Sequence, residues 1–209
     1  MDNLIKEFQN IKVNEIMDKA KNGDMQAQYV IAYYYENGLN VKQNHKTAVD
    51  WYKKSSDQGF SFAKNGLGVL YQNGIGVKQD YIKSVKFYQD AANLGHAMAK
   101  YNLGFLYENG HGVDMSHETA IDWYAKAAEH GISDAYFKLG FFNFSGFGVI
   151  ENKFEAYVFI SISMLLGNKS AEQLLNNINW RVYFDDKAKT DGEKKAIDMV
   201  EKIKSNNPN

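Results

Sequence analysis

The sequence predicts an all-α protein, a right-handed α/α solenoid of helix pairs, and three observations lead to this fold class. Glycine recurs every 36 residues, apolar residues between the glycines follow helical spacing, and the only proline is Pro208. Because proline is the strongest helix breaker, its absence before Pro208 leaves long stretches in which helices are not interrupted in this way. We expect four full repeats, a partial fifth repeat and helical caps.

The repeat is defined by glycines in one phase along most of the chain. The first glycines of the repeats are Gly23, Gly59, Gly95, Gly131 and Gly167. Alanine follows four residues later, and Ile31 or leucine eight residues later, in all five. The repeats therefore span 23–58, 59–94, 95–130 and 131–166, within a single domain covering 1–209. Residues 1–22 are an N-terminal capping helix and residues 167–209 a partial repeat with C-terminal capping helices.

Each repeat is expected to form two helices, A and B. In the third repeat, helix A covers 97–108, and Gly110 after it can adopt the left-handed conformation that ends a helix. The turn Gly110-His111-Gly112-Val113 leads to helix B at 119–130. One position before helix B always holds a residue suited to cap a helix N-terminus. These residues are Asn44, Asp80, Ser116 and Asn152.

Glycine inside helix A predicts close packing of a neighbouring helix. Gly68, Gly104 and Gly140 each cost about 1 kcal/mol relative to alanine in a helix, so a recurring glycine implies a steric reason. Small residues recur in helix B as well, and an aromatic residue after them is expected to fill the space between layers. These aromatics are Trp51, Phe87, Trp123 and Phe159.

The two ends of the chain depart from the repeat, as capping segments do. Residues 3–21 predict one amphipathic helix. The capping-box pattern from Thr190 to Glu193 predicts the start of a charged C-terminal helix. Residues 176–189, which include Trp180, are the least periodic stretch.

The pattern resembles the Sel-one-like repeat, a relative of the tetratricopeptide repeat. The third repeat carries the run Ala99, Leu103-Gly104, Tyr107, Gly110-His111-Gly112-Val113, Ala120, Trp123-Tyr124 and Ala127-Ala128. The resemblance covers 23–175 and weakens in the first repeat, which has Ala32 and Asn40 in place of two glycines, and in the fourth, which has Asn143 in place of tyrosine. It implies adaptor and scaffold roles, including bacterial interactions with host or competitor proteins.

Composition argues against several classes of function. The formal net charge is −1 and Arg181 is the only arginine, which disfavours nucleic acid as a partner. The sequence contains no apolar run of about 18 residues, so we predict no segment that inserts into a membrane. The first residues do not show the basic start and following apolar run of a signal peptide. We therefore expect a cytoplasmic protein, with leaderless secretion as an alternative.

No residue pattern predicts catalysis, a metal or a cofactor. Cysteine is absent, and no two of the five histidines have the spacing of a zinc-binding helix. The Gly-x-Gly turns recur at the repeat period, which explains them by turn geometry rather than by phosphate binding. We therefore predict no enzyme, no metal site and no cofactor.

The predicted functional surface is the concave side lined by helix A. By analogy with tetratricopeptide repeats, the positions six, ten, thirteen and fourteen residues after each repeat glycine line this side. The predicted protein-binding residues are Tyr29, Tyr33, Glu36, Asn37, Asn65, Gln72, Asn73, Tyr101, Phe105, Glu108, Asn109, Phe137 and Phe141, and Val69, Phe144 and Ser145 complete the pattern. Phe137, Phe141 and Phe144 suit burial between helices as well as exposure. Tyr29, Tyr33 and Tyr101 are expected to be exposed, because phenol groups tolerate water.

These observations predict a module that binds a peptide or protein. We expect the partner to contact Tyr29, Tyr33, Tyr101 and Phe105, with Glu36 and Glu108 favouring a partner that carries Lys or Arg. A narrower alternative is a dedicated inhibitor, such as an immunity protein against a bacterial toxin, or a secreted effector. An enzyme is the third alternative.

Overall fold

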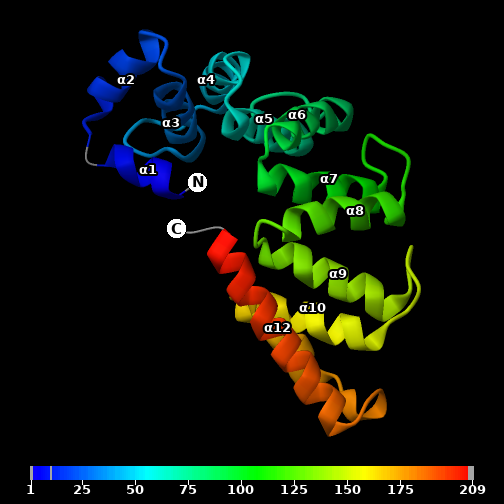
Figure 1. The fold of residues 1–209 in the computed structure, drawn as a ribbon. Coiled ribbons are helices and arrows are strands. Elements are labelled where there is room, and N and C mark those ends of the chain that lie inside the picture. Colours follow the sequence, from blue (N-terminus) through cyan, green and yellow to red (C-terminus); the bar gives the residue numbers. More distant parts are fainter. Residues whose placement is uncertain (1, 10, 207–209) are drawn as a thin grey trace. The chain divides into compact units, whose positions relative to one another are not determined.

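The structure is a computed structural model that describes residues 2–9 and 11–206. Within these residues all regular structure is helical, which confirms the predicted all-α class (Figure 1). The helices are α1 (Asp2–Gln9), α2 (Val13–Lys21), α3 (Met25–Asn37), α4 (His45–Asp57), α5 (Ser61–Asn73), α6 (Tyr81–Asn93), α7 (Ala97–Asn109), α8 (His117–Ala128), α9 (Ser133–Ser145), α10 (Lys153–Leu165), α11 (Lys169–Asn177), the 3-10 helix η1 (Trp180–Val182) and α12 (Asp186–Asn206).

The chain forms two compact units. Unit 1 comprises residues 1–99 with 111–113, and unit 2 comprises 100–110 with 114–209. In unit 1, helices A and B of the first two repeats pair as α3 with α4 and α5 with α6, and α4 also packs on α5. In unit 2, α8 packs on α9, α9 on α10, and α10 on both α11 and α12. Within each unit, neighbouring helices of successive pairs therefore pack on one another, as the repeat predicts.

The N-terminal cap is a helix pair rather than the single helix expected over 3–21. Helix α1 ends at Gln9 and α2 begins at Val13. Residues 1 and 10, which the predicted cap included, lie outside the described part of the chain. Phe8 of α1 and Ile16 and Ala20 of α2 are buried in the core of unit 1. Both helices therefore cover the apolar end of the first repeat.

The predicted caps of helix B are present in all four repeats. The side chain of Asn44 accepts a hydrogen bond from the backbone N–H of Thr47, at 3.1 Å. Asp80, Ser116 and Asn152 accept the equivalent bond at 3.0–3.1 Å. Each bond satisfies a backbone donor that has no partner within the helix, and this fixes where helix B begins.

The second glycine of the turn has two structural reasons. Gly112 has a φ of +75°, and a Cβ there would lie 2.6 Å from the backbone carbon of Tyr81 in the preceding helix B. Gly76 and Gly148 approach His45 and His117 in the same way. Asn40 replaces this glycine in the first repeat and has a φ of +57°, which asparagine tolerates better than most residues. The first repeat follows no earlier helix B, so its turn lacks the second constraint.

Glycine inside helix A makes room for a buried side chain of helix B. A Cβ at Gly68 would lie 2.5 Å from the ring of Tyr88, and one at Gly104 would lie 2.7 Å from the ring of Tyr124. Tyr88 and Tyr124 are fully buried, whereas Trp123 is only half-buried, with the Lys126 amine 4.3 Å from its ring centroid. The aromatic residue that fills the layer is therefore one position later than predicted, because the tyrosine side of helix B faces helix A.

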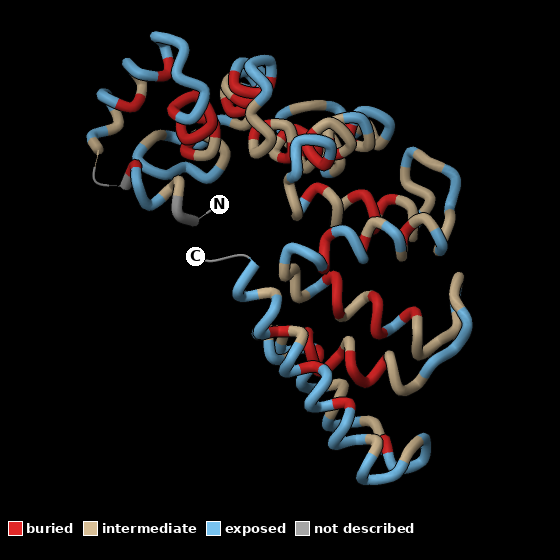
Figure 2. Tube along the Cα trace, in the orientation of Figure 1, coloured by how far each residue is buried: buried red, intermediate tan, exposed pale blue. Residues whose placement is uncertain are grey.

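The C-terminal end leaves the repeat geometry. Helix α11 has nine residues, compared with 13 in α9, and the chain then passes through η1 into α12. Helix α12 begins at Asp186, four residues before the predicted Thr190, because the Asp185 side chain accepts the N–H of Ala188 at 2.8 Å. Figure 2 shows that α12 is mostly exposed, and its buried residues are Gly192, Ala196 and Val200.

Candidate functional site

The predicted binding stripe divides into buried, structural and exposed parts. In unit 1 the prediction that Tyr29 is exposed is wrong, because its side chain is 2% exposed. Its ring packs 5.6 Å from Tyr52, 5.4 Å from Phe60 and 6.0 Å from Phe62. Asn65 is buried too. Tyr29 and Asn65 therefore belong to the core, and Tyr33 of the same stripe is half-buried.

The residue thirteen positions after the repeat glycine accepts a hydrogen bond from the buried tyrosine of helix B. Glu36 accepts from Tyr52 at 2.6 Å, and Gln72 accepts from Tyr88 at 2.8 Å. In unit 2, Glu108 accepts from Tyr124 at 2.5 Å. A buried hydroxyl without an acceptor is costly, so these predicted binding residues have a structural task.

The fourth repeat replaces both members of this pair. Phe144 stands at the acceptor position and Ile160 at the tyrosine position, and both belong to one apolar cluster. Because neither side chain carries a buried polar group, the pair needs no hydrogen bond. The exchange of both residues together explains why an apolar side chain is tolerated where the other repeats have Glu or Gln.

The residue fourteen positions after the repeat glycine closes helix A. The side-chain amides of Asn37, Asn73 and Asn109 donate to the carbonyl oxygens of Tyr33, Val69 and Phe105, at 2.8–2.9 Å. The Ser145 hydroxyl donates to the Phe141 carbonyl at 2.9 Å. These four exposed or half-buried residues satisfy carbonyl groups at the helix end, and this accounts for their recurrence without a ligand.

In unit 2 the predicted stripe presents aromatic side chains beside an ion pair. Phe141 is 44% exposed, whereas Tyr101, Phe105 and Phe137 are half-buried. Phe144 is also half-buried, with its ring 5.9 Å from Trp180. Phe137, Phe141 and Phe144 were each expected to suit either burial or exposure, and Phe141 is the one that is exposed.

The charge on this stripe is neutralised within the protein. The Lys138 amine lies 2.8 Å from a carboxylate oxygen of Glu108, and both side chains are largely buried. Burial and the charges of Asp134 and Glu108 raise the pKa of Tyr101 to about 12. Burial and the hydrogen bond to Glu108 raise the pKa of Tyr124 as well. The stripe of unit 2 is therefore neutral and aromatic at physiological pH.

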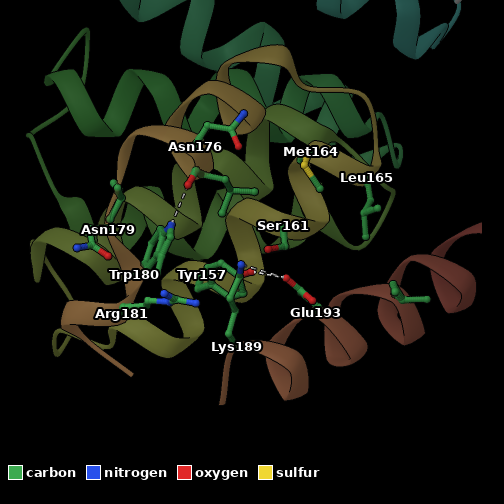
Figure 3. Close-up of a pocket in the computed structure, with 13 residues that line it drawn as sticks. Tyr157, Ser161, Met164, Leu165, Asn176, Asn179, Trp180, Arg181, Lys189 and Glu193 are labelled. Carbon is green, nitrogen blue, oxygen red and sulfur yellow. Dashed lines mark hydrogen bonds and ion pairs between the residues drawn. The ribbon is translucent and has the colours of Figure 1, made fainter. Parts of the chain in front are cut away.

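A pocket lies at the C-terminal end of unit 2, where sequence periodicity had stopped. Its volume is about 560 Å³, within the range of small-ligand pockets. Tyr157, Ser161, Met164 and Leu165 of α10 form one wall, and Lys189, Glu193 and Ile197 of α12 form another (Figure 3). Leu175 and Asn176 of α11, with Ile178, Asn179, Trp180 and Arg181, complete the lining.

Sequence reasoning missed this pocket because it arises from packing at the end of the repeat array. The signals available were Trp180 and the sole arginine in an aperiodic stretch, but nothing in their spacing indicates which helices surround them. No group of three His, Asp or Glu residues in the described part of the chain could hold a metal ion. No helix of residues 2–9 and 11–206 is long and apolar enough to cross a bilayer.

Helix pairs that repeat in sequence and pack pair on pair define an α/α repeat protein, a class whose members depend on neighbouring repeats for their core. The Sel1 repeat model matches residues 26–60, 61–96, 97–132 and 133–161. The chain belongs to the Sel1 repeat family, whose repeats form protein-interaction modules.

Solved structures support the same fold. A Sel1 repeat protein from Oxalobacter formigenes has 30% sequence identity and a TM-score of 0.74, over 88% of this chain and 77% of that one. A protective antigen of uropathogenic Escherichia coli with an SLR fold has 26% identity and a TM-score of 0.64, over 92% of this chain and 50% of that one. An immunity protein from Pseudomonas aeruginosa has 20% identity and a TM-score of 0.57, over 97% and 81%. A comparison with curated proteins gives no match.

Proposed function

We propose that this protein is a non-enzymatic adaptor that binds a protein segment on the helix-A stripe of unit 2. The observation that carries the proposal is an exposed aromatic side chain, Phe141, on a stripe otherwise occupied by half-buried aromatics. Aromatic side chains supply much of the energy at protein interfaces, especially where polar groups surround them.

The contacts of the stripe define the kind of partner. Because Lys138 neutralises Glu108, the preference for a basic partner expected from this carboxylate is not supported in unit 2. Phe105 and Phe141 come from α7 and α9, so they present apolar surface from successive A helices. The partner segment is therefore apolar or aromatic, with few charges, and its binding depends little on salt.

Site-specific photo-crosslinking in the source cell tests this proposal. A benzoyl-phenylalanine at position 141 keeps a phenyl group at an exposed site, so the fold is expected to be retained. We expect discrete cross-linked adducts with one or more partner proteins. The matched control places the same residue at Ile82, which is 73% exposed on α6 and does not belong to the stripe. Equal adducts at both positions, or none at 141, would contradict the proposed surface.

Alanine variants then test whether the contact contributes to affinity. Replacing Phe105 and Phe141 together is expected to weaken binding of the partner at least tenfold, with an unchanged helical circular dichroism spectrum. The Ile82→Ala variant is expected to bind as the parent protein does. Loss of helicity in the double variant would instead assign both rings to the core.

An immunity protein is a narrower form of the same function. Neighbours from Pseudomonas aeruginosa carry this name at 18–20% identity, and such a likeness supports only a shared fold. The crosslinking experiment separates the two forms. A dedicated inhibitor gives a single partner and a complex that survives extensive washing, whereas a general adaptor gives several partners.

A further inference from the structure

The C-terminal pocket exists because the fifth repeat is incomplete. Helix α11 ends at Asn177, and Trp180 stands thirteen residues after Gly167, at the position that accepts the tyrosine hydroxyl in the first three repeats. After it the chain turns away into α12, which packs along α10. The space lined by the ends of α10 and α11, the 178–181 segment and α12 is the pocket (Figure 3).

Hydrogen bonds and ring contacts hold the walls in place. The Trp180 indole N–H donates to the Leu175 carbonyl oxygen at 3.2 Å, and its ring centroid lies 5.0 Å from that of Tyr157. The Tyr157 hydroxyl donates to Glu193 at 2.9 Å, which links α10 to α12 across the pocket wall. Trp180 and Tyr157 are both buried. The pocket is therefore formed before any ligand arrives, which lowers the cost of binding.

The lining combines an apolar patch with cationic groups. Leu165 and Ile197 are 42% and 48% exposed, so both present apolar surface to a ligand. Arg181 and Lys189 provide positive charge, and Glu193 is the only acidic residue in the lining. Glu193 already accepts the Tyr157 hydroxyl and lies 3.8 Å from the Lys189 amine.

Arg181 can exchange its present partner for a ligand. Its Nε lies 3.2 Å from Asp186, and the side chains of the pair are 77% and 75% exposed. Exposed ion pairs contribute little to stability because water and salt screen them. The pair uses Nε, one of the five N–H donors of a guanidinium, and the arrangement of these donors matches a carboxylate. Asp186 does not line the pocket, so a carboxylate inside it would meet Arg181 from the pocket side.

We propose that this pocket binds a peptide segment of a partner protein in which an acidic side chain stands next to an aliphatic one. The aliphatic side chain packs on Leu165 and Ile197, and the carboxylate pairs with Arg181. The site is separate from the helix-A stripe and does not depend on the function proposed for it.

The three tryptophans give a direct test by NMR. The 15N-labelled full-length protein has indole N–H signals from Trp51, Trp123 and Trp180, and Trp→Phe variants at the two half-buried positions, 51 and 123, assign the third by elimination. The probe is the peptide acetyl-Asp-Leu-amide, titrated to about 10 mM because so small a ligand binds weakly. We expect a saturable shift of the Trp180 signal, with the other two unchanged.

Matched peptides and variants separate the two halves of the proposal. Acetyl-Asn-Leu-amide lacks the charge and acetyl-Asp-Gly-amide lacks the aliphatic group, and each is expected to bind at least fivefold more weakly. Arg181→Gln is expected to reduce binding of the Asp-Leu peptide to the level of the Asn-Leu peptide. Lys187→Gln, at an 87% exposed side chain that does not line the pocket, is expected to change nothing.

Three outcomes would overturn the proposal. They are no shift at Trp180, equal binding of the Asp and Asn peptides, and an Arg181→Gln variant that binds normally while its indole signals match those of the parent protein. The Phe105/Phe141 double variant is expected to bind the peptide unchanged, so failure of this site and failure of the helix-A stripe are distinguishable.

Discussion

Replacing Gly104 by alanine tests the close contact between helices A and B. In an unhindered helix this change stabilises by about 1 kcal/mol, because glycine loses more backbone entropy on folding. At Gly104 the added Cβ would lie 2.7 and 2.8 Å from two ring carbons of Tyr124. That ring is fully buried and its hydroxyl is held by Glu108, so it cannot move away without losing the hydrogen bond.

Overpacking of this kind typically costs about 1–3 kcal/mol. Because the Tyr124 ring is fixed at both ends, we expect a cost near the upper end of that range. Subtracting the helix-propensity gain leaves a net destabilisation of about 1–2 kcal/mol. The result is therefore opposite in sign to the effect of alanine in an ordinary helix.

Urea unfolding followed by circular dichroism measures this effect as a lower midpoint with an unchanged slope. The control is Ala125→Gly at an exposed position in α8, which reports propensity alone and should cost about 1 kcal/mol. A Gly104→Ala variant as stable as the parent protein, or more stable, would refute the steric explanation for the recurring glycine.

Four further predictions concern buried or half-buried side chains. Tyr124→Phe removes the donor to Glu108 and should cost about 1–2 kcal/mol in urea unfolding, while Trp123→Ala should cost less than Tyr124→Ala because its ring is half-buried. Burial lowers the pKa of His96 to about 4, and its Nδ1 accepts the N–H of Ala99 at 3.2 Å. Because the unfolded chain binds this proton near pH 6.5 and the folded protein only near pH 4, the free energy of unfolding should fall by about 2 kcal/mol between pH 6.5 and 4. His96→Asn keeps a capping acceptor that does not titrate, and a thermal melt series that still shows the same loss would contradict this cause. The Tyr124→Phe variant should show the same rise in tyrosine absorbance near 295 nm below pH 11 as the parent protein, because burial and the hydrogen bond to Glu108 raise the pKa of Tyr124.

The repeat lattice predicted most of the fold because its positions have local causes. Capping by Asp80 depends on residues within one turn, so the sequence alone predicts this cap, although helix B of the third repeat begins at His117 rather than at 119. The close approach at Gly104 was also predictable, because glycine recurs where a helix would otherwise favour alanine. The sequence could not predict which ring of helix B fills this gap, because Trp123 and Tyr124 are adjacent and both aromatic.

The binding stripe was harder to predict because burial depends on the next repeat. Tyr29 and Tyr101 share one repeat position, but Phe60 and Phe62 cover the first, while Ile132 and Asp134 occupy the equivalent positions after the second. Helical spacing places these residues on one stripe without indicating what lies over it. The C-terminal pocket lies further beyond such reasoning, because residues 176–189 have left the repeat.

The first repeat shows how two departures from the pattern explain each other. It has Ala32 where later repeats have glycine, and the ring of its buried Tyr52 lies against Gly66 of the next repeat. A Cβ at Gly66 would lie 3.2 Å from that ring. In the second and third repeats the ring of the buried tyrosine packs against the glycine of helix A, but Ala32 leaves less room there. We infer that the ring of Tyr52 lies against Gly66 instead, which gives a reason for a glycine outside the 36-residue lattice.

The tyrosine–acceptor pairs limit how such a chain can be recombined. A recombination event between helices A and B could join helix A of the fourth repeat, with Phe144, to helix B of the third repeat, with Tyr124. This chimaera would bury the Tyr124 hydroxyl with no acceptor. The reverse exchange would bury a carboxylate against isoleucine. The unit that can be exchanged without breaking a tyrosine–acceptor pair is therefore the whole helix pair, and viable chimaeras of this protein should have their junctions at the glycines between repeats.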